Sequence, residues 1–372
     1  MSFLDNLLSK SKSFIKFATP VNSIVGIDVG TSSIKVVQVR REGGKIQLET
    51  YGELGLGTYA NEKVGKVVTL APDVIATAIK DILREANVTT KSAILSIQSQ
   101  ATLIFLIELP PNVKESELAT IIPNEARKYI PVSLTEVSLD WYVVPQKQTY
   151  AEEQNAGDVA PKTEVVVVAV RNETLAQYRD ISQKAGIDTR GNEIEIFSAI
   201  RAVFHREISP TLVIDYGAGT TKVSIVEYGV VRAYHVINRG SAFITESIAR
   251  TMTIDFDKAE ELKRSVGMNA VAGQEKVAES VAANTQYIIN EIQTVLLQYE
   301  RVSQKAVTRI ILCGGGSSMP GFLEKMVESF GVETVYGDPF EKTEAPEFMK
   351  PVLSKAGPEF TVAMGLALKD FL

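Results

Sequence analysis

The chain has 372 residues, of which 45% are hydrophobic and 23% charged, a globular composition that excludes wholesale disorder and leaves room for two or three domains. Its formal net charge of −6 argues against a nucleic-acid-binding protein, which normally carries a basic face. The single cysteine, Cys313, excludes an intramolecular disulfide and a cysteine-based zinc site, and two histidines are too few for a His-rich metal centre.

The N-terminal residues combine apolar side chains with lysines. Lys10, Lys12 and Lys16 interrupt the apolar residues, which is unlike a signal peptide, and no apolar run in the chain approaches the roughly 20 residues that span a bilayer. We therefore expect a cytoplasmic protein. Residues 1–20 predict an amphipathic arm, which either docks on its own domain, stays partly ordered, or lies on an anionic membrane surface.

The first motif is a predicted hairpin tip between the apolar runs 23–27 and 34–39. Gly30 allows a turn with positive φ, and the small residues after it leave backbone N–H groups free to converge on a phosphate. Lys35 adds a positive charge, and Asp28 suits a hydrated Mg²⁺ held through water. Such a turn alone is equally typical of an ordinary hairpin.

A second copy of this layout lies at residues 211–223. In both copies an apolar strand ends in Ile-Asp, a glycine follows two residues after the aspartate, and a lysine follows seven after it, which gives Asp215, Gly217 and Lys222 here. Two phosphate-type hairpins in one chain indicate an internal duplication. We expect each copy to supply one side of a nucleotide cleft.

The third motif joins a buried-type strand at 309–313 to three consecutive glycines and then to a helical pattern at 322–330. Consecutive glycines allow the backbone to lie directly against a flat ligand such as a purine. The motif is not a Walker P-loop, because the Gly-Lys-Ser/Thr ending is missing.

The remaining chain alternates between strands and helices. An apolar stretch at 191–204 predicts a crossover helix, and one at 360–368 predicts a second connecting helix. A polar stretch at 146–163 predicts a long hairpin loop. Further helices are predicted at 72–86, 115–129, 172–185, 241–251, 256–265 and 275–304, and strands at 45–54, 93–99, 102–109, 138–144 and 164–170.

The three motifs, in this order, resemble the phosphate 1, phosphate 2 and adenosine motifs of the actin, heat-shock-chaperone and sugar-kinase ATPase superfamily. Within it, the segments 25–39, 124–131 and 259–263 resemble the PilM family, actin-like proteins of type IV pilus assembly that are related to FtsA. The resemblance implies an α/β, actin-like ATPase fold. Two duplicated domains would surround a nucleotide cleft, with an FtsA/PilM-type inserted α+β subdomain.

The resemblance also implies domain boundaries. After the arm at 1–20, the core of the first domain would comprise 21–91 and 171–205, and the inserted subdomain 92–170. The second domain would comprise 206–372, including a helical subdomain at 241–305 on the adenosine side.

The implied cofactors are ATP and Mg²⁺, with Asp28 and Asp215 holding the metal through water. Glu193 or Glu195 would orient the attacking water, although both equally suit a helix N-terminus. Glu260 and Lys263, three apart on a predicted helix, would grip the ribose hydroxyls or form an ordinary surface pair. The full implied nucleotide set is Asp28, Gly30, Thr31, Ser32, Ser33, Lys35, Asp215, Gly217, Ala218, Gly219, Thr220, Thr221, Lys222, Glu260, Lys263, Gly314, Gly315, Gly316, Ser317 and Met319.

The resemblance implies a protein peripheral to the inner membrane, which binds the cytoplasmic N-terminal tail of a PilN-type membrane protein in a groove beside the inserted subdomain. Other pilus platform proteins, assembly ATPases and a second copy of the chain are further candidate partners. Phosphoryl transfer depends on positioning and charge stabilisation, so these residues indicate ATP binding better than turnover. We expect slow or no hydrolysis by the chain alone.

Three alternatives remain at this point. The first is an FtsA-like division or cytoskeletal filament protein, although the chain ends at Leu372 without the basic amphipathic helix expected of FtsA. The second is a type II secretion platform homologue. The third is a small-molecule kinase, which the scarcity of Asp and Asn between residues 90 and 140 disfavours.

Overall fold

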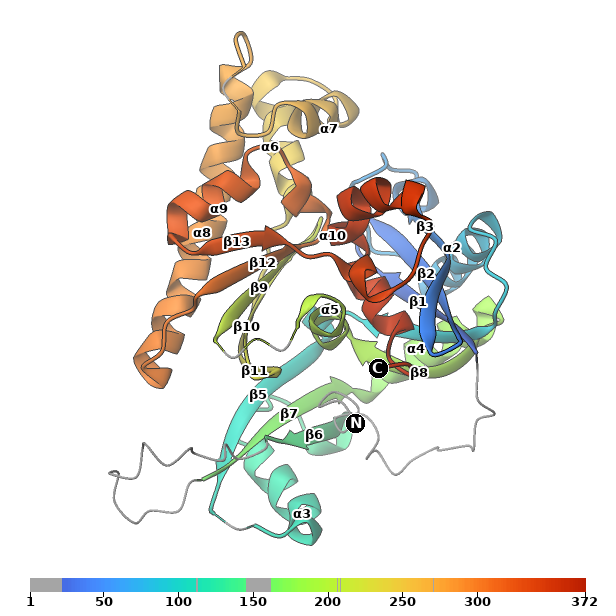
Figure 1. Ribbon diagram of the computed structural model, residues 1–372, viewed down its shortest axis with the longest axis vertical. Coiled ribbons are helices and arrows are strands. Elements are labelled where there is room, and N and C mark those ends of the chain that lie inside the picture. Colours follow the sequence, from blue (N-terminus) through green and yellow to red (C-terminus); the bar gives the residue numbers. More distant parts are fainter. Residues whose placement is uncertain (1–21, 112, 145–161, 206, 208, 270) are drawn as a thin grey trace. The chain divides into compact units, whose positions relative to one another are not determined.

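The computed structural model describes residues 22–111, 113–144, 162–205, 207, 209–269 and 271–372. The predicted arm at 1–20 and nearly all of the predicted loop at 146–163 lie outside these residues. The described chain forms two compact units, one of residues 100–176 and one of residues 22–99 with 177–372 (Figure 1). None of the described helices is long and apolar enough to cross a membrane.

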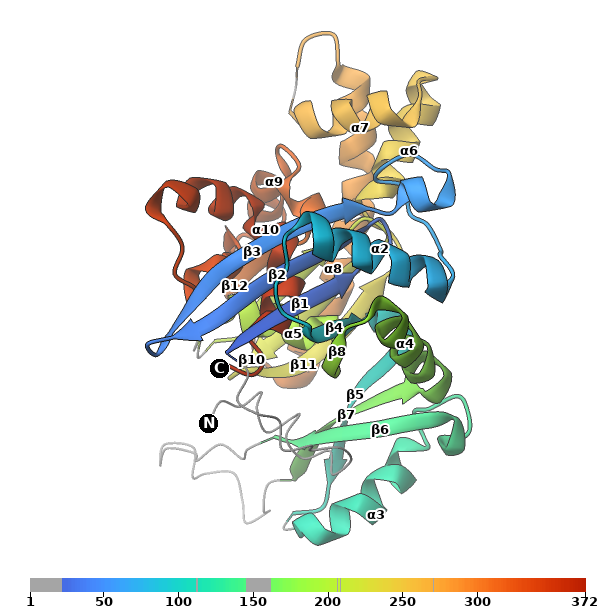
Figure 2. The same cartoon turned by 90° about the vertical axis from the view of Figure 1, so that its right-hand side faces the viewer.

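The larger unit contains a first five-stranded sheet in the order β3-β2-β1-β4-β8. β1, β2 and β3 are antiparallel neighbours, whereas β4 and β8 run parallel to β1. The helix α2 lies along β2 and β3 (Figure 2), and α10 packs on β1 and β2. The bounds are β1 Ser23–Val29, β2 Ser33–Glu42, β3 Lys45–Gly55, α2 Pro72–Glu85, β4 Ser92–Ile97, β8 Asp188–Ile194, α5 Glu195–Val203 and α10 Lys350–Ala367.

A second five-stranded sheet in the same unit has the order β11-β10-β9-β12-β13 and the same sequence of antiparallel and parallel pairings. The helices α6, α8 and α9 pack against it around one apolar core. The bounds are β9 Thr211–Tyr216, β10 Thr221–Glu227, β11 Val230–Ile237, α6 Ser241–Met252, α7 Phe256–Ser265, α8 Glu275–Ser303, β12 Arg309–Cys313, α9 Phe322–Phe330 and β13 Glu333–Tyr336.

The two sheets repeat each other down to the strand register. Asp28 pairs with Lys35 across β1 and β2, and Asp215 pairs with Lys222 across β9 and β10. Each turn is closed by one backbone hydrogen bond of 3.0 Å, donated by the N–H of Gly30 in the first and of Gly217 in the second. The duplication expected from the sequence is therefore present in the topology.

The helix α10 packs unusually closely on both α5 and β1, because a glycine lies at each contact. A Cβ on Gly365 of α10 would lie 1.8 Å from the carbonyl oxygen of Ser198 on α5. A Cβ on Gly26 of β1 would lie 2.0 Å from the carbonyl oxygen of Ala363. Only residues without a side chain allow this backbone-to-backbone packing.

The smaller unit is a three-stranded antiparallel sheet, β5-β7-β6, with α3 on one face. Alternate residues of the central strand, Val165, Val167 and Ala169, bury against Leu118 and Ile122 of α3. The bounds are β5 Thr102–Leu109, α3 Glu115–Ala126, β6 Val137–Val143 and β7 Thr163–Arg171, followed by α4 Asn172–Ala185, which continues into the larger unit.

Several expected boundaries are wrong. The strand β4 belongs to the first sheet, because residues 93–95 pair with β1, so the inserted unit begins at residue 100 rather than 92. The second domain does not extend to residue 372, because α10 packs on the first sheet. The expected helix at 191–204 is a strand up to Ile194 and a helix from Glu195, and the helix expected from 360 begins at Lys350.

Candidate functional site

The two equivalent turns of the larger unit approach each other. A Cβ on Gly219, in the β9–β10 turn, would lie 2.7 Å from Oγ1 of Thr31 in the β1–β2 turn and 3.4 Å from Val67. The residues that the sequence predicts for phosphate binding, Gly30, Thr31 and Ser32 on one side and Gly217, Ala218 and Gly219 on the other, are all partly exposed. The structure thus brings the two predicted phosphate motifs together.

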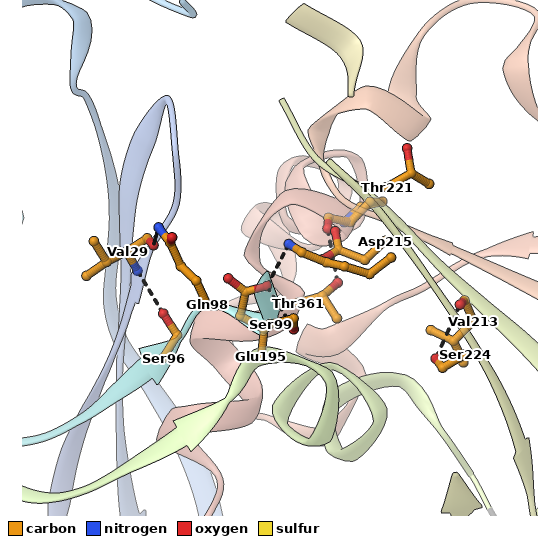
Figure 3. A network of polar contacts seen from close by, with 12 residues as sticks. Val29, Ser96, Gln98, Ser99, Glu195, Val213, Asp215, Thr221, Ser224 and Thr361 are labelled. Atoms are coloured by element: carbon orange, nitrogen blue, oxygen red, sulfur yellow. Dashed lines mark hydrogen bonds and ion pairs between the residues drawn. The ribbon is translucent and has the colours of Figure 1, made fainter. Parts of the chain in front are cut away.

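Two side chains that were not predicted from the sequence as site residues hold the first turn in place. The N–H of Val29 donates to Oγ of Ser96 at 2.9 Å, and Nε2 of Gln98 donates to the carbonyl oxygen of Val29 at 3.1 Å (Figure 3). Ser96 is completely buried. A serine inside the apolar strand β4 was the available signal, because a buried hydroxyl needs a partner.

Lys222 occupies the centre of the second motif. Its Nζ lies 2.7 Å from Oε2 of Glu195 and 3.1 Å from Oδ2 of Asp215. Glu195, the first residue of α5, also accepts a hydrogen bond from Oγ of Ser99 at 3.4 Å (Figure 3). The side chains of Lys222, Glu195 and Asp215 are 17%, 5% and 14% exposed, so the charges are largely shielded from water.

The charges in this cluster do not balance. Burial, with a smaller contribution from Asp215, raises the pKa of Asp28 although Lys35 and Lys222 oppose the shift. Burial, then Asp28 and Asp215, raise the pKa of Glu195 to about 7 against the opposing Lys222. Burial lowers the pKa of Lys222, but the neighbouring carboxylates outweigh it and raise the pKa well above its usual value.

Asp28, Glu195 and Asp215 therefore outnumber the two ammonium groups that act on them, Lys222 and Lys35, and Lys35 is also paired with Glu53. A hydrated divalent cation would relieve the excess negative charge. No group of three or more His, Cys, Asp or Glu side chains within the described residues is arranged to chelate a metal directly. Mg²⁺ keeps several waters and takes one or two carboxylates together with phosphate oxygens, so the carboxylates at the two turns could hold it only through water. Asp28 and Asp215 are the carboxylates of the two motifs, and the Mg²⁺ role expected of them stays a prediction.

The structure distinguishes the two candidate glutamates. Glu193, on β8, is fully buried and makes a two-pronged ion pair with Arg201, at 2.5 and 2.7 Å, and accepts from Ser198 at 2.5 Å. These bonds occupy both carboxylate oxygens away from the charged cluster. The structure therefore separates the two glutamates that the sequence left as alternatives, because β8 ends at Ile194 between them and Glu195 contacts Lys222 whereas Glu193 contacts Arg201.

Lys35 lies in the first motif as expected but is already paired. Its Nζ is 2.7 Å from Oγ of Ser33 and 2.9 Å from Oε1 of Glu53. Burial lowers the pKa of Lys35, yet Glu53 and Asp28 outweigh it and raise the pKa above its usual value. Glu53, on β3, was not identified from the sequence, and no local pattern marks it.

The glycine loop of the third motif packs on the second. Gly314 has φ of +80°, and a Cβ there would lie 2.5 Å from Oδ1 of Asp215. Ser317 and Met319 are buried, with the Ser317 hydroxyl donating to the Gly314 carbonyl and Met319 packed in the core. These two side chains therefore shape the loop from inside and are not part of its exposed surface. Gly315 and Ser318 are the exposed residues of the loop.

Four other expected residues are buried or engaged in internal contacts. The hydroxyl of Thr221 donates to the carbonyl oxygen of Arg239 at 2.8 Å, and Thr220 is buried. Lys263 is buried, and its Nζ lies 2.7 Å from Glu260, 2.9 Å from Oγ1 of Thr245 and 3.2 Å from the Ser241 carbonyl oxygen. The pair expected to grip a ribose is thus bound within the protein.

Comparison with known proteins identifies the family of this chain. A sequence model of the family described as type IV pilus assembly protein PilM matches residues 26–371. This chain belongs to the PilM family. Curated relatives include the cell division protein FtsA of Streptococcus pneumoniae, 21% identical over 82% of this chain and 73% of that protein, and FtsA of Enterococcus faecalis, 22% identical over 82% and 76%.

Solved structures confirm the expected actin-like ATPase fold for this PilM-family chain. A PilM–PilN type IV pilus biogenesis complex contains a chain with a TM-score of 0.78 and 24% identity, covering 95% of this chain and 100% of that one. EutJ of Carboxydothermus hydrogenoformans has a TM-score of 0.53 and 15% identity, and the match covers 94% of this chain and 90% of that one. MreB5 of Spiroplasma citri bound to ADP has a TM-score of 0.51 and 13% identity, and the match covers 93% of this chain and 95% of that one.

Proposed function

We propose that this chain is an ATP-binding, actin-like protein that holds the cytoplasmic N-terminal tail of a PilN-type membrane protein at the cytoplasmic face of the inner membrane. The observation that carries the proposal is the similarity, over 95% of the chain, to a protein solved in a PilM–PilN complex. The paired turns, with their partly exposed backbone and their shared charged cluster, support the nucleotide-binding part.

In the cleft, Lys35 and the backbone N–H groups of the two turns would hold the phosphates. A bound Mg²⁺ would neutralise phosphate charge beside Asp28 and Asp215. Lys222 fixes Asp215 and Glu195 in position through contacts of 3.1 and 2.7 Å. Glu195 is the residue we assign to orienting a water, and its own engagement with Lys222 favours slow or no hydrolysis by the chain alone.

Calorimetric titration of the full chain with MgATP tests the nucleotide half of the proposal. Lys35→Ala should weaken ATP binding at least about tenfold, because it removes a charge-assisted contact. The matched control is Lys45→Ala, whose side chain is 66% exposed and ion-paired with Glu344 at the surface. Absence of ATP binding by the folded wild-type chain, or ADP formation at many turnovers per second, would contradict this part.

The smaller unit is the proposed docking place of the tail. Its outer strands β5 and β6 have no strand partner on their outer edges among the described residues, so an extended peptide could add to the sheet. Leu103 on β5 is 39% exposed, and Tyr129, 51% exposed, stacks on Phe105 at 4.8 Å. These apolar side chains suit a tail that carries apolar anchors.

Fluorescence anisotropy of a labelled PilN-type tail peptide, in the presence of MgATP, tests the docking. We expect micromolar or tighter binding that a scrambled peptide lacks and that Leu103→Asp or Tyr129→Asp weakens. The control Val302→Asp alters an 82% exposed residue of α8 in the other unit and should leave binding unchanged. Equal binding of the scrambled peptide would refute the docking.

The similarity to FtsA supports one alternative, an actin-like filament. Sedimentation of the chain with and without MgATP separates the two functions. Nucleotide-dependent polymers combined with no affinity for the tail peptide would favour the filament. Pilus assembly ATPases and other platform proteins remain proposed additional partners.

A further inference from the structure

An open groove is lined by the start of β3 together with the segment 343–347 that precedes α10. Backbone hydrogen bonds join these two walls. The N–H of Leu48 donates to the carbonyl oxygen of Glu344 at 3.0 Å, and the N–H of Glu344 donates to the carbonyl oxygen of Ile46 at 2.7 Å. The groove has a volume of about 760 Å³, which is enough room for several side chains of a peptide.

The surface of this groove is both apolar and acidic. Leu48 and Ala345 line it and pack on the apolar core of the first sheet. Phe348, the residue after the lining Glu347, is 81% exposed, and Val352, four residues further on, is 58% exposed. Among the described residues that line the groove, carboxylates outnumber cationic groups, with Glu42, Glu49, Glu344 and Glu347 against Arg40 and Lys350. Such a surface suits a ligand that combines apolar and positively charged side chains.

The described residues begin beside this groove. The carbonyl oxygen of Asn22 accepts a hydrogen bond of 2.8 Å from the N–H of Arg41. The hydroxyl of Ser23 donates to Oε2 of Glu49, a lining residue, at 2.6 Å. The arm at 1–20 ends two residues before Asn22 and is therefore tethered next to the groove. Twenty residues extend about 30 Å even as a helix, which is ample to reach it.

The sequence of the arm has the chemistry that the groove suits. Its charged side chains are three lysines, Lys10, Lys12 and Lys16, and one acid, Asp5. Its large apolar residues are Phe3, Leu4, Leu7, Leu8, Phe14, Ile15 and Phe17. A tethered segment also binds at a high effective concentration, so even weak complementarity favours it over a separate partner of the same composition.

We propose that the groove between β3 and the segment 343–347, extended by Phe348 and Val352, is the docking site of the chain's own N-terminal arm. Apolar side chains of the arm cover Phe348 and Val352, and its lysines lie near the exposed carboxylates of Glu344 and Glu347. Of the three placements expected for the arm, this is docking on its own domain. The docking depends on neither the nucleotide nor the PilN-type tail.

Tryptic cleavage after Lys10, Lys12 and Lys16, followed by mass spectrometry, tests the proposal on the full chain. The reference is a synthetic peptide of residues 1–21, cleaved under the same conditions. Because a protease cuts the undocked segment, we expect cleavage of the arm in wild type to be at least about tenfold slower than cleavage of the peptide. This protection should fall about twofold to threefold between about 0.05 and 0.5 M NaCl, since salt screens the charge contacts.

Substitutions in the groove locate the docking site. Phe348→Asp and Val352→Asp alter exposed side chains and should each reduce the protection to about twofold or less. The matched control is Val302→Asp, which alters an 82% exposed residue of α8 and should keep the wild-type protection. Thermal unfolding of each variant establishes that it is folded before digestion.

Every other outcome overturns the inference. Wild-type cleavage as fast as that of the peptide shows that the arm is undocked, and protection that survives both groove substitutions shows that it docks elsewhere. Protection that increases with protein concentration would assign the groove to the arm of a second copy. Protection that appears only when phosphatidylglycerol vesicles are added would assign the arm to a membrane surface.

Discussion

Among single residues, Glu193 and Arg201 form the most enclosed ion pair in the larger unit, with side chains 0% and 3% exposed. Glu193→Gln leaves the Arg201 guanidinium buried without its counter-ion. We expect the free energy of unfolding to fall by about 3–5 kcal/mol, measured by urea denaturation. The double variant Glu193→Leu/Arg201→Met removes both charges and should recover much of this loss. Equal stability of the single variant and wild type would contradict the expectation.

The same pair predicts a pH dependence. Burial raises the pKa of Glu193, but Arg201 and the other partners outweigh it, so the folded-state pKa lies below the usual value of 4.5. A carboxyl with a depressed folded-state pKa stabilises the fold above its unfolded-state pKa and loses that contribution as pH falls through the folded-state value. Wild-type stability should therefore decline below pH 4.5 more steeply than that of Glu193→Gln.

Lys222 gives a second prediction at this scale. Lys222→Met leaves Asp28, Glu195 and Asp215 together without the ammonium that two of them contact. We expect the nucleotide-free chain to lose about 3–5 kcal/mol of unfolding free energy in urea denaturation. The control Lys258→Met removes an exposed ammonium paired with Glu261 and should cost about 1 kcal/mol or less. Equal losses in both variants would show that burial at the cluster does not matter.

The sequence identified residues at this scale where a repeated pattern marked them. The spacing shared by Asp28–Lys35 and Asp215–Lys222 appears in the structure as the same cross-strand pairing. Ser96 and Glu53 carry no such pattern, because their proximity to the turn depends on how separate strands pair. Glu193 and Glu195 could not be distinguished, since the change from strand to helix between them is set by pairing with β4.

Among the elements, the crossing of α5 and α10 depends on Gly365. Gly365→Ala places a methyl group against the Ser198 backbone, which cannot move aside as a flexible side chain can. We expect a loss of about 1–3 kcal/mol and a lower melting temperature, because overpacking forces the helices apart. Gly191→Ala in β8, where the nearest atom to a new Cβ is 3.8 Å away, is the control and should change stability far less.

The same helices show why element boundaries are difficult to predict from sequence. The apolar run at 191–204 suits a buried strand or a buried helix, and periodicity alone does not separate them. In α10, Pro358 normally indicates the end of a helix, yet the helix continues through it to Ala367, with Pro358 buried and its carbonyl bound to Gly314. Tertiary packing determines both where α5 begins and that α10 continues through Pro358.

At the scale of the whole molecule, the duplication could be predicted from the sequence, whereas the sheet to which β4 and α10 belong could not. Two copies of one motif implied two equivalent sheets, and both have the same strand order. Nothing local assigns β4 or α10 to the first sheet, because those contacts join residues far apart in the chain. The segment 57–68, which we call the strap, was likewise not singled out although it links the two halves of the larger unit.

The strap is fixed to the first turn and reaches α7 of the second half. Its flanking N–H groups, from Leu56 and Val68, donate to the carbonyl oxygens of Ser32 and Thr31 at 2.8 and 2.9 Å. Its middle contacts α7 through Lys63 and Asp257, 2.5 Å apart, and a Cβ on Gly65 would lie 3.7 Å from the ring of Phe256. A nucleotide between the two turns would therefore be released more easily when the strap leaves α7.

Reversing the charges of this contact tests that role. Lys63→Glu places two carboxylates together, and we expect a fluorescent ATP analogue to dissociate up to about fivefold faster in stopped-flow displacement, since an exposed ion pair contributes at most about 1 kcal/mol. Asp257→Lys should act similarly by pairing two ammonium groups. The double variant Lys63→Glu/Asp257→Lys restores an opposite-charge pair and should return the rate towards that of wild type. Additive effects in the double variant would show that the strap does not control release through this contact.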